Sequence, residues 1–240
     1  MEDLSRCADF RERLESWTKT TQLQPTLLRL PKGRNIYSSG DRDRSIYLVE
    51  SGYVKLFAST CEGRNCLLTI HGVGDIFGEL CLASVSRAET AAALDDSRIR
   101  QINADHFLAF IIQNGLADMF ISHLLTRVAE YQQTVFNLVT ADAEHRLAAA
   151  LQRISSKPRR NDRSDRRVES LISQQELSEM VGTTRSRIGH FLKKFRSMGL
   201  IEGGTRAFTI NGNKLAAHLD AYSYECDWAL PKNISKVAQK

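Results

Sequence analysis

The stretch "ISQQELSEMVGTTRSRIGHFLKKFRSMGLIE", residues 172–202, predicts two short helices joined by a turn. Ser173 stands three residues before Glu176, which is the spacing of a capping box at a helix start. Gly182 is placed to end this first helix, because glycine adopts the left-handed conformation found after helix C-termini. Thr183 or Thr184 can then cap the second helix.

The second helix has one apolar face and one polar face. Its inner face is formed by Ile188, Phe191, Leu192 and Phe195. After it, "LIEGGTRAFTI" (200–210) alternates in polarity around a Gly-Gly turn and predicts a β-hairpin. Helix, glycine-containing turn, second helix and β-wing together are the outline of a winged helix-turn-helix.

The charge distribution agrees with a nucleic-acid partner for this region. Residues 141–206 contain 14 Lys/Arg and 8 Asp/Glu, whereas the whole chain has a net charge of only +5. Arg185, at the start of the second helix, can pair bidentately with a guanine edge, and neighbouring side chains can contact bases or phosphates. The predicted DNA-binding residues are Thr183, Thr184, Arg185, Ser186, Arg187, His190, Lys193, Lys194 and Arg206.

Residues 30–102 predict antiparallel β-structure, with short alternating runs and glycine turns typical of an all-β sandwich or barrel. Within them lies "GDIFGELCLASVSRAET" (74–90), which sets Glu79 and Arg87 among apolar residues. A carboxylate and a guanidinium in such surroundings are costly to bury unless each has a partner.

From about Ala104 the period becomes helical. Apolar residues spaced alternately by four and three form a heptad seam, which indicates a partner helix and favours a parallel homodimeric coiled coil. The seam consists of Ala117, Ile121, Leu124, Val128, Tyr131, Val135 and Leu138.

Other protein classes receive little support from the sequence. We find no nucleophile elbow, zinc-protease motif, P-loop or paired acid/base motif, so an enzyme is not expected. The five cysteines include no CxxC pair, and we predict no metal site. No apolar run has the length of a membrane span, and the charged start is unlike a signal peptide, so we expect a cytoplasmic protein.

Taken together, residues 20–215 resemble the CRP/FNR superfamily of bacterial transcription regulators. "LPKGRNIYSSGDRDRSIYLVESGYVKL" is similar to that family's opening β-roll strands, "GDIFGEL…SRAET" to its phosphate-binding cassette, and residues 172–202 to its DNA-binding helices. The resemblance implies an α+β fold with four parts. These are an N-terminal antiparallel, jelly-roll-like sensor β-roll (1–103), a long dimerisation helix with hinge (104–140), a winged helix-turn-helix (141–222) and a C-terminal tail (223–240).

The resemblance also implies an effector site. In cyclic-AMP-binding members, the cassette's Glu and Arg, here Glu79 and Arg87, hold the ribose and the cyclic phosphate. The candidate effector residues are Gly78, Glu79, Leu80, Arg87, Ala88, Tyr131 and Gln132. This sequence departs from the pattern at Ala88, where Ser or Thr is usual, and at Glu89, which would repel a phosphate if it faced inward.

Three hypotheses about the function therefore remain. The first is a homodimeric regulator that binds palindromic double-stranded DNA, works with RNA polymerase, and is controlled by a small effector, with cyclic AMP as one candidate. The second is the same regulator with no required ligand. The third is a cyclic-nucleotide-binding regulatory subunit that acts on a protein partner, and the basic winged helix argues against it.

Overall fold

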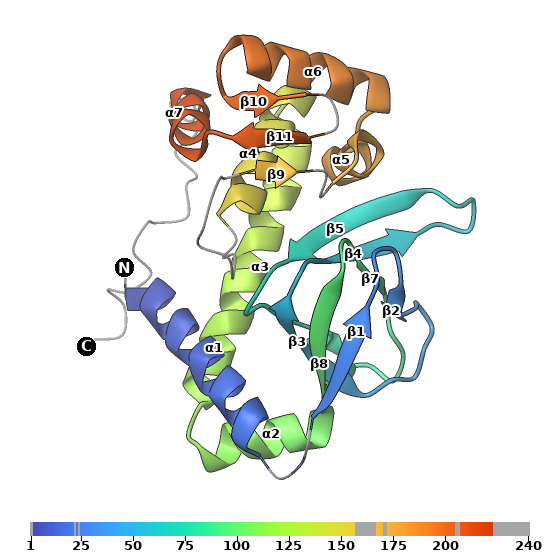
Figure 1. Ribbon diagram of the computed structural model, residues 1–240, viewed down its shortest axis with the longest axis vertical. Coiled ribbons are helices and arrows are strands. Elements are labelled where there is room, and N and C mark those ends of the chain that lie inside the picture. The colour runs from blue at the N-terminus through green and yellow to red at the C-terminus, as the bar shows by residue number, and fades with distance from the viewer. Residues whose placement is uncertain are drawn as a thin grey trace.

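The computed structural model describes residues 2–21, 23, 25–156, 167–169, 172–204 and 207–222. A β-roll occupies the lower part of the molecule, a helical domain with a small sheet occupies the upper part, and the long helix α3 connects them (Figure 1). The predicted tail at 223–240 lies outside the described residues. In the part that the structure describes, no helix is long and apolar enough to cross a membrane.

The β-roll consists of two four-stranded antiparallel sheets, in the orders β1-β8-β3-β6 and β2-β7-β4-β5. A buried cluster that includes Tyr37, Tyr47 and Phe77 packs between them. The strands are β1 (Thr26–Leu30), β2 (Asn35–Tyr37), β3 (Ser45–Ser51), β4 (Val54–Ser59), β5 (Asn65–His71), β6 (Ile76–Phe77), β7 (Thr90–Ala93) and β8 (Ser97–Asn103), with the 3-10 helix η1 (Glu79–Leu82) between β6 and β7.

The helices around the β-roll differ from the prediction in two ways. A first helix, α1 (Glu2–Thr20), precedes the strands and was not predicted; its Phe10 and Leu14 are fully buried. The segment 104–140 is two helices, α2 (Ala104–Gln113) and α3 (Ala117–Thr140), rather than one. Gly115 has a φ of +62° between them, a conformation in which a helix does not continue.

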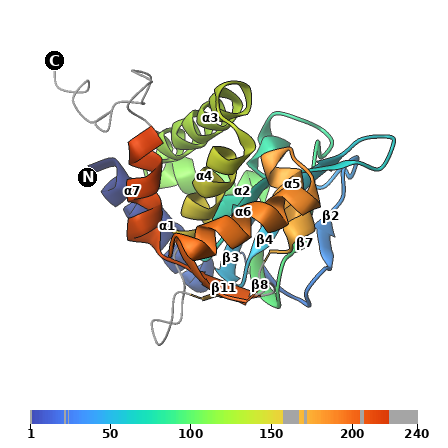
Figure 2. The ribbon, with the colours of Figure 1, turned by 90° about the horizontal axis from the view of Figure 1, so that it is seen from above.

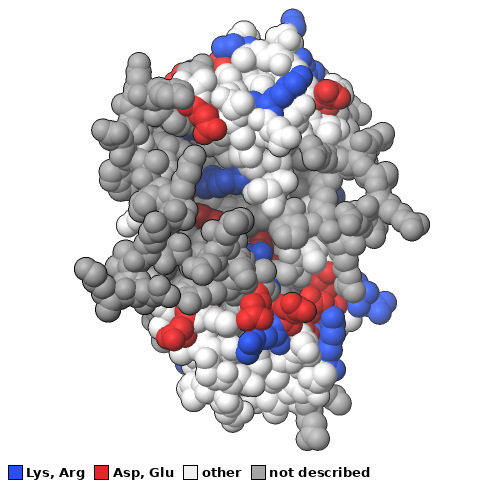
Figure 3. Space-filling model, turned by 90° about the vertical axis from the view of Figure 1, so that its left-hand side faces the viewer, with Lys and Arg blue, Asp and Glu red and all other residues white. Residues whose placement is uncertain are grey.

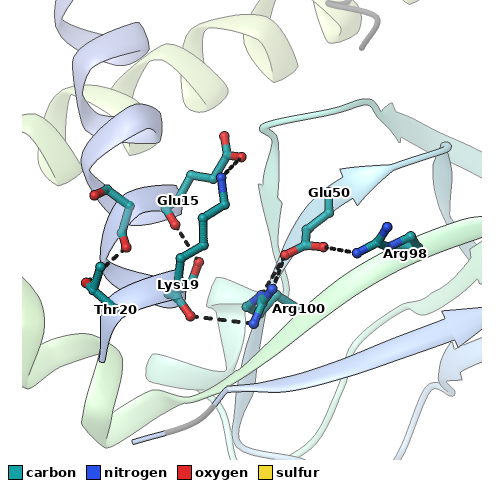
Figure 4. A network of polar contacts seen from close by, with 8 residues as sticks. Glu15, Lys19, Thr20, Glu50, Arg98 and Arg100 are labelled. Carbon is teal, nitrogen blue, oxygen red and sulfur yellow. Dashed lines mark hydrogen bonds and ion pairs between the residues drawn. The ribbon is translucent and has the colours of Figure 1, made fainter. Parts of the chain in front are cut away.

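A buried carboxylate joins α1 to the β-roll. Glu50 on β3 lies between Arg98 and Arg100 of β8 (Figure 4), and Arg100 Nε donates to Glu50 Oε1 over 2.7 Å. Arg100 also donates to the backbone carbonyl of Thr18 near the end of α1, over 3.5 Å. One acidic side chain thus orients two arginines, and one of them fastens the N-terminal helix.

The upper domain confirms the predicted helix-turn-helix. Ser173 and Glu176 form a capping box, Gly182 ends α5 with a φ of +70°, and the Thr184 side chain caps α6. The four predicted inner-face residues of α6 are all buried. The elements are α4 (Ala143–Ser155), β9 (Arg167–Glu169), α5 (Gln174–Val181), α6 (Arg185–Ser197), β10 (Ile201–Gly203), β11 (Ala207–Ile210) and α7 (Gly212–Tyr222), and the three strands form an antiparallel sheet in the order β10-β11-β9.

The helical domain packs directly on the β-roll of its own chain. Leu67 and Ile70 of β5 belong to the same buried cluster as Leu177 of α5. Lys55 of β4 forms a 2.7 Å ion pair with Glu176, and both side chains are mostly buried. Burial alone would raise the pKa of Glu176, but hydrogen bonds from Lys55 and Ser173 outweigh it and hold the pKa below its ordinary value.

Arg146 forms hydrogen bonds at the C-terminal ends of two helices. Arg146 on α4 donates from Nη1 to the carbonyl of Ala141, which follows α3, over 2.8 Å. Its Nε donates to the carbonyl of Val181, the last residue of α5, over 2.9 Å. A cation at helix C-termini is favourable, because the unpaired carbonyls there carry partial negative charge. Arg146 therefore fixes the turn of the helix-turn-helix relative to the end of the long helix.

We predict that Arg146→Gln lowers the free energy of unfolding by at least about 1.5–3 kcal/mol, the value of one hydrogen bond to a charged group. Urea unfolding followed by circular dichroism measures it. Arg13→Gln on α1 removes an exposed arginine whose ion pair with Asp9 is also exposed, and this control should change stability by less than about 0.5 kcal/mol. Equal effects of the two substitutions would contradict the role given to Arg146.

Candidate functional site

Helix α6, the second helix of the helix-turn-helix, lies across the top of the molecule, where Figure 2 shows it facing the viewer. Arg185, Ser186 and Arg187 at its N-terminal end are exposed, as is His190 one turn later. The Arg187 guanidinium lies 5.6 Å from the centre of the Phe191 ring. Because the buried face of α6 fixes the helix on the domain, its first turn can enter a major groove.

The predicted phosphate contacts are placed unequally. Lys193 and Lys194 are both exposed, but Lys194 lies 2.8 Å from Glu144 in an ion pair. Thr184 caps α6, and the Thr183 hydroxyl is buried with no hydrogen-bond partner among the described residues. Arg206 lies outside the described residues. Lys193 is therefore better placed than Lys194 or Thr183 to meet a phosphate.

In the cassette, Arg87 points into the β-roll and is almost completely buried. Its Nη1 donates to the carbonyl of Gly78 over 2.6 Å, and its Nη2 donates to the Ser45 carbonyl over 2.5 Å and to Asp43 Oδ2 over 2.7 Å. The guanidinium also lies over the Tyr37 ring, 4.1 Å from its centre. Its Nε has no partner among the described residues and is itself buried. The protein's own groups thus occupy the hydrogen-bonding edge that would hold a cyclic phosphate.

Gly78 has a steric role in this arrangement. Its φ is +83°, and a Cβ there would lie 3.0 Å from Arg87 Nη1 and 3.1 Å from a ring carbon of Tyr47. Any side chain at this position would push the guanidinium away from the carbonyl that it binds. The glycine predicted to contact an effector therefore makes room for Arg87.

Asp43 supplies the negative charge beside Arg87. Burial alone would raise the pKa of its carboxyl, but hydrogen bonds from Tyr47, Ser45 and Arg87 and the arginine's charge outweigh burial and hold the pKa below its ordinary value of 3.8. At neutral pH the pair is therefore a carboxylate and a guanidinium, and the positive charge is already neutralised.

Glu79 is also engaged. Its carboxylate lies 2.8 Å from Arg127 Nη1 on α3, and both side chains are mostly buried. Arg127 further donates to the Ile76 carbonyl over 3.2 Å and to the Tyr131 hydroxyl over 3.0 Å. Tyr131 is a seam residue, so this network connects the cassette to the predicted dimer interface.

The remaining candidate effector residues do not gather around Arg87. Leu80, Ala88 and Gln132 are exposed. Glu89 does face inward, where it accepts a hydrogen bond from the Tyr37 hydroxyl over 2.8 Å. Burial, together with the charge of Glu89, raises the pKa of Tyr37.

Sequence reasoning missed Asp43, Tyr37 and Arg127. The first two lie on separate strands or loops, more than forty residues from Arg87, and no local spacing reveals them. Arg127 had a detectable signal, since it stands four residues before Tyr131 on one helix face.

Comparisons with known proteins agree with this architecture. A family model described as "Cyclic nucleotide-binding domain" matches residues 27–114, and a "Crp-like helix-turn-helix domain" matches residues 145–217. The chain belongs to the CRP/FNR family of transcription regulators. As a CRP/FNR regulator it is a DNA-binding protein and not an enzyme.

Its relatives cover most of its length. It is 26% identical over 184 residues to a "CRP-like cAMP-activated global transcriptional regulator" of Mycobacterium tuberculosis, covering 76% of this chain and 81% of the relative. It is 24% identical over 196 residues to the "Fumarate and nitrate reduction regulatory protein" of Escherichia coli, covering 81% and 78%. The fold is that of FixK2 from Bradyrhizobium japonicum, with a TM-score of 0.67 and 19% identity over 80% of this chain and 96% of that one.

A pH titration tests the Asp43–Arg87 pair. Because the pKa of Asp43 is lowered by folding, its carboxylate stabilises the native state above the unfolded-state pKa, and this contribution disappears as the pH falls through the lower native value. The melting temperature of the wild type should therefore exceed that of Asp43→Asn at neutral pH, and the gap should close below the ordinary value of 3.8. A gap that stays constant from neutral pH to about pH 3 would contradict the pairing.

A second prediction separates base reading from phosphate binding on α6. Arg185→Ala should cost roughly 1–3 kcal/mol on a selected site and relax the preference at one base pair, whereas Lys193→Ala should weaken all sequences alike. Competition binding at fixed salt, against single-base variants of the site, measures both. Equal losses on specific and random DNA for Arg185→Ala would refute a base contact.

Proposed function

We propose that this CRP/FNR regulator is a cytoplasmic homodimer that binds palindromic DNA through its two α6 helices and works with RNA polymerase at promoters. The apolar seam of α3 is the observation that supports a dimer. Five of its residues, Ile121, Val128, Tyr131, Val135 and Leu138, are between 42% and 60% exposed in the single chain. A row of exposed apolar side chains along one helix face requires a partner surface.

The effector is a separate question, because relatives differ in the signal that their names record. The Mycobacterium tuberculosis relative is called cAMP-activated, and a structural relative from Xanthomonas campestris is called c-di-GMP responsive. The latter has a TM-score of 0.63 and 22% identity over 83% of this chain and 98% of that one. Similarity to these proteins therefore does not identify an effector for this chain.

The geometry of the cassette favours a regulator whose β-roll requires no cyclic nucleotide. A cyclic phosphate at Arg87 would have to displace Asp43, and a ribose at Glu79 would have to displace Arg127. Breaking a buried ion pair by removing one partner costs several kcal/mol, since the other charge is left uncompensated. The Arg87 and Glu79 ion pairs support a structural role for the cassette.

DNA binding with and without nucleotide tests this proposal. The protein without ligand should bind a selected palindromic site far more tightly than random DNA, and saturating cyclic AMP, cyclic GMP or cyclic di-GMP should leave that affinity unchanged. None of the three should raise the melting temperature, whereas a ligand at a hundred times its dissociation constant would add about 2.7 kcal/mol of stability. Specific DNA binding that appears only with a nucleotide would contradict the proposal that the β-roll requires no cyclic nucleotide.

The dimer seam gives a further prediction. Val135→Glu places a charge within the apolar seam, so sedimentation should show a monomer and binding to the palindrome should be lost. Thr126→Glu is the matched control, because it adds the same charge at an exposed position on the opposite side of α3. A dimer that persists in Val135→Glu would place the interface elsewhere.

A further inference from the structure

A cavity lies where the β-roll, the long helix and the helical domain meet. It has a volume of about 310 Å³ and receives residues from α1, β5, α3, α4 and α5; we call it the junction cavity. In Figure 1 these elements converge beside the middle of α3, and Figure 3 shows blue and red atoms at the waist between the two halves. A volume near 300 Å³ is sufficient for a small metabolite. The cavity is distinct from the Arg87 cassette, and no residue of it was a predicted site residue.

One wall of the junction cavity carries a cation that its surroundings compensate incompletely. Arg153 of α4 donates to the Thr134 hydroxyl over 2.7 Å, which is a neutral partner. Burial lowers the pKa of its guanidinium, and the charge of Glu130, which also lines the cavity, only partly opposes this. Arg153 is exposed to solvent, so an anion can reach it, and an anion beside its partly desolvated guanidinium would stabilise the charge.

Helix α1 contributes a second guanidinium to the lining of the junction cavity, and one of its donors has no described partner. Arg11 of α1 pairs through Nη2 with Asp75 over 2.9 Å. Its Nε is buried and has no hydrogen-bond partner among the described residues. Buried donors are normally satisfied, so this N–H is a further place for an acceptor oxygen.

The rest of the lining limits the chemistry of the ligand. Ile70, Ile154 and Met180 present apolar surface, whereas Glu130 and Asp75 are acids, and Asp75 is paired with Arg11. One anionic group would offset the charge of Arg153, but a second negative charge would face the carboxylate of Glu130. A ligand with a single carboxylate and an apolar body fits these walls better than a dicarboxylate or a phosphate dianion.

We propose that the junction cavity binds a small monocarboxylic acid, with its carboxylate held by Arg153 and Arg11 and its apolar part against Ile154 and Met180. The ligand then contacts the β-roll, the seam helix and the DNA-binding domain together. Because those contacts exist only in one arrangement of the three parts, the acid stabilises that arrangement and changes DNA affinity. An effector that acts in this way typically changes the affinity for the second ligand about 5- to 150-fold. The effect on DNA rests on the proposed function; the binding of the acid does not.

Thermal melts of the full chain test the binding. The probes are acetate, butyrate, hexanoate and benzoate at about 10 mM, with succinate, inorganic phosphate and chloride at matched ionic strength. Butyrate, hexanoate or benzoate should raise the melting temperature more than any of the other ions. The rise should be lost in Arg153→Gln and reduced in Arg11→Gln, and it should persist in Arg13→Gln, which removes an exposed arginine from the same helix as Arg11.

Met180→Trp provides a variant that keeps both arginines. It adds bulk at the apolar wall, so it should abolish the response to the acids even in a protein that melts cooperatively. No shift with any monocarboxylate, a largest shift with phosphate or succinate, or an unchanged shift in Arg153→Gln would each overturn the proposed site.

DNA binding, measured in the same buffers, separates this inference from the proposed function. A change of DNA affinity with the acid, absent in Arg153→Gln, supports the coupling. A melting shift with unchanged DNA affinity keeps the site and overturns the coupling. Absence of specific DNA binding in every buffer would overturn the proposed function and leave the melting result intact.

Discussion

The arrangement of the β-roll depends on one buried guanidinium. Arg87 has little exposed surface, so its charge needs partners inside the protein, and the fold supplies a carboxylate, two backbone carbonyls and a tyrosine ring. Each partner constrains its own segment: Gly78 must lack a side chain, Asp43 must stay ionised, and Tyr37 must present its face. Under the proposed function this cassette, which resembles a ligand site by sequence, is a structural joint, because a charge that the protein has already neutralised offers little to an incoming anion.

Ion pairs also connect the cassette and the β-roll to the rest of the molecule. Glu79 reaches Arg127 on α3, and Arg127 reaches Tyr131 on the exposed seam, so the cassette and the predicted dimer surface are connected through ion pairs and hydrogen bonds. On the other side, Lys55 and Glu176 attach the β-roll to α5, the first helix of the helix-turn-helix. Arg153 contrasts with all of these, since its described hydrogen-bond partner is a neutral hydroxyl. This difference distinguishes Arg153, which lines the junction cavity, from the other polar contacts that connect the β-roll, α3 and the DNA-binding domain.

Local features of this chain could be predicted from the sequence, and non-local ones could not. The capping box at Ser173 and Glu176 and the inner face of α6 depend on spacings of three and four residues, which a sequence displays directly. Helix α1 also displays such a spacing in Phe10, Leu14 and Trp17, but its many charges concealed it. The break at Gly115 was missed because the seam was followed from Ala117 onward and the residues before it were joined to it. The partners of Arg87 depend on how strands and loops meet in space, and periodicity contains no information about that.

The guanidinium of Arg146 has a mechanical consequence. It holds the carbonyl after α3 and the carbonyl that ends α5 at the same time, so turning the DNA-binding domain about the end of the long helix breaks bonds to both together. Gradual bending at that point would leave a charged side chain half-bonded throughout the movement. Rotation of the DNA-binding domain about this point therefore requires both hydrogen bonds to be exchanged together, and the ends of α3 and α5 move as one unit as long as those bonds hold.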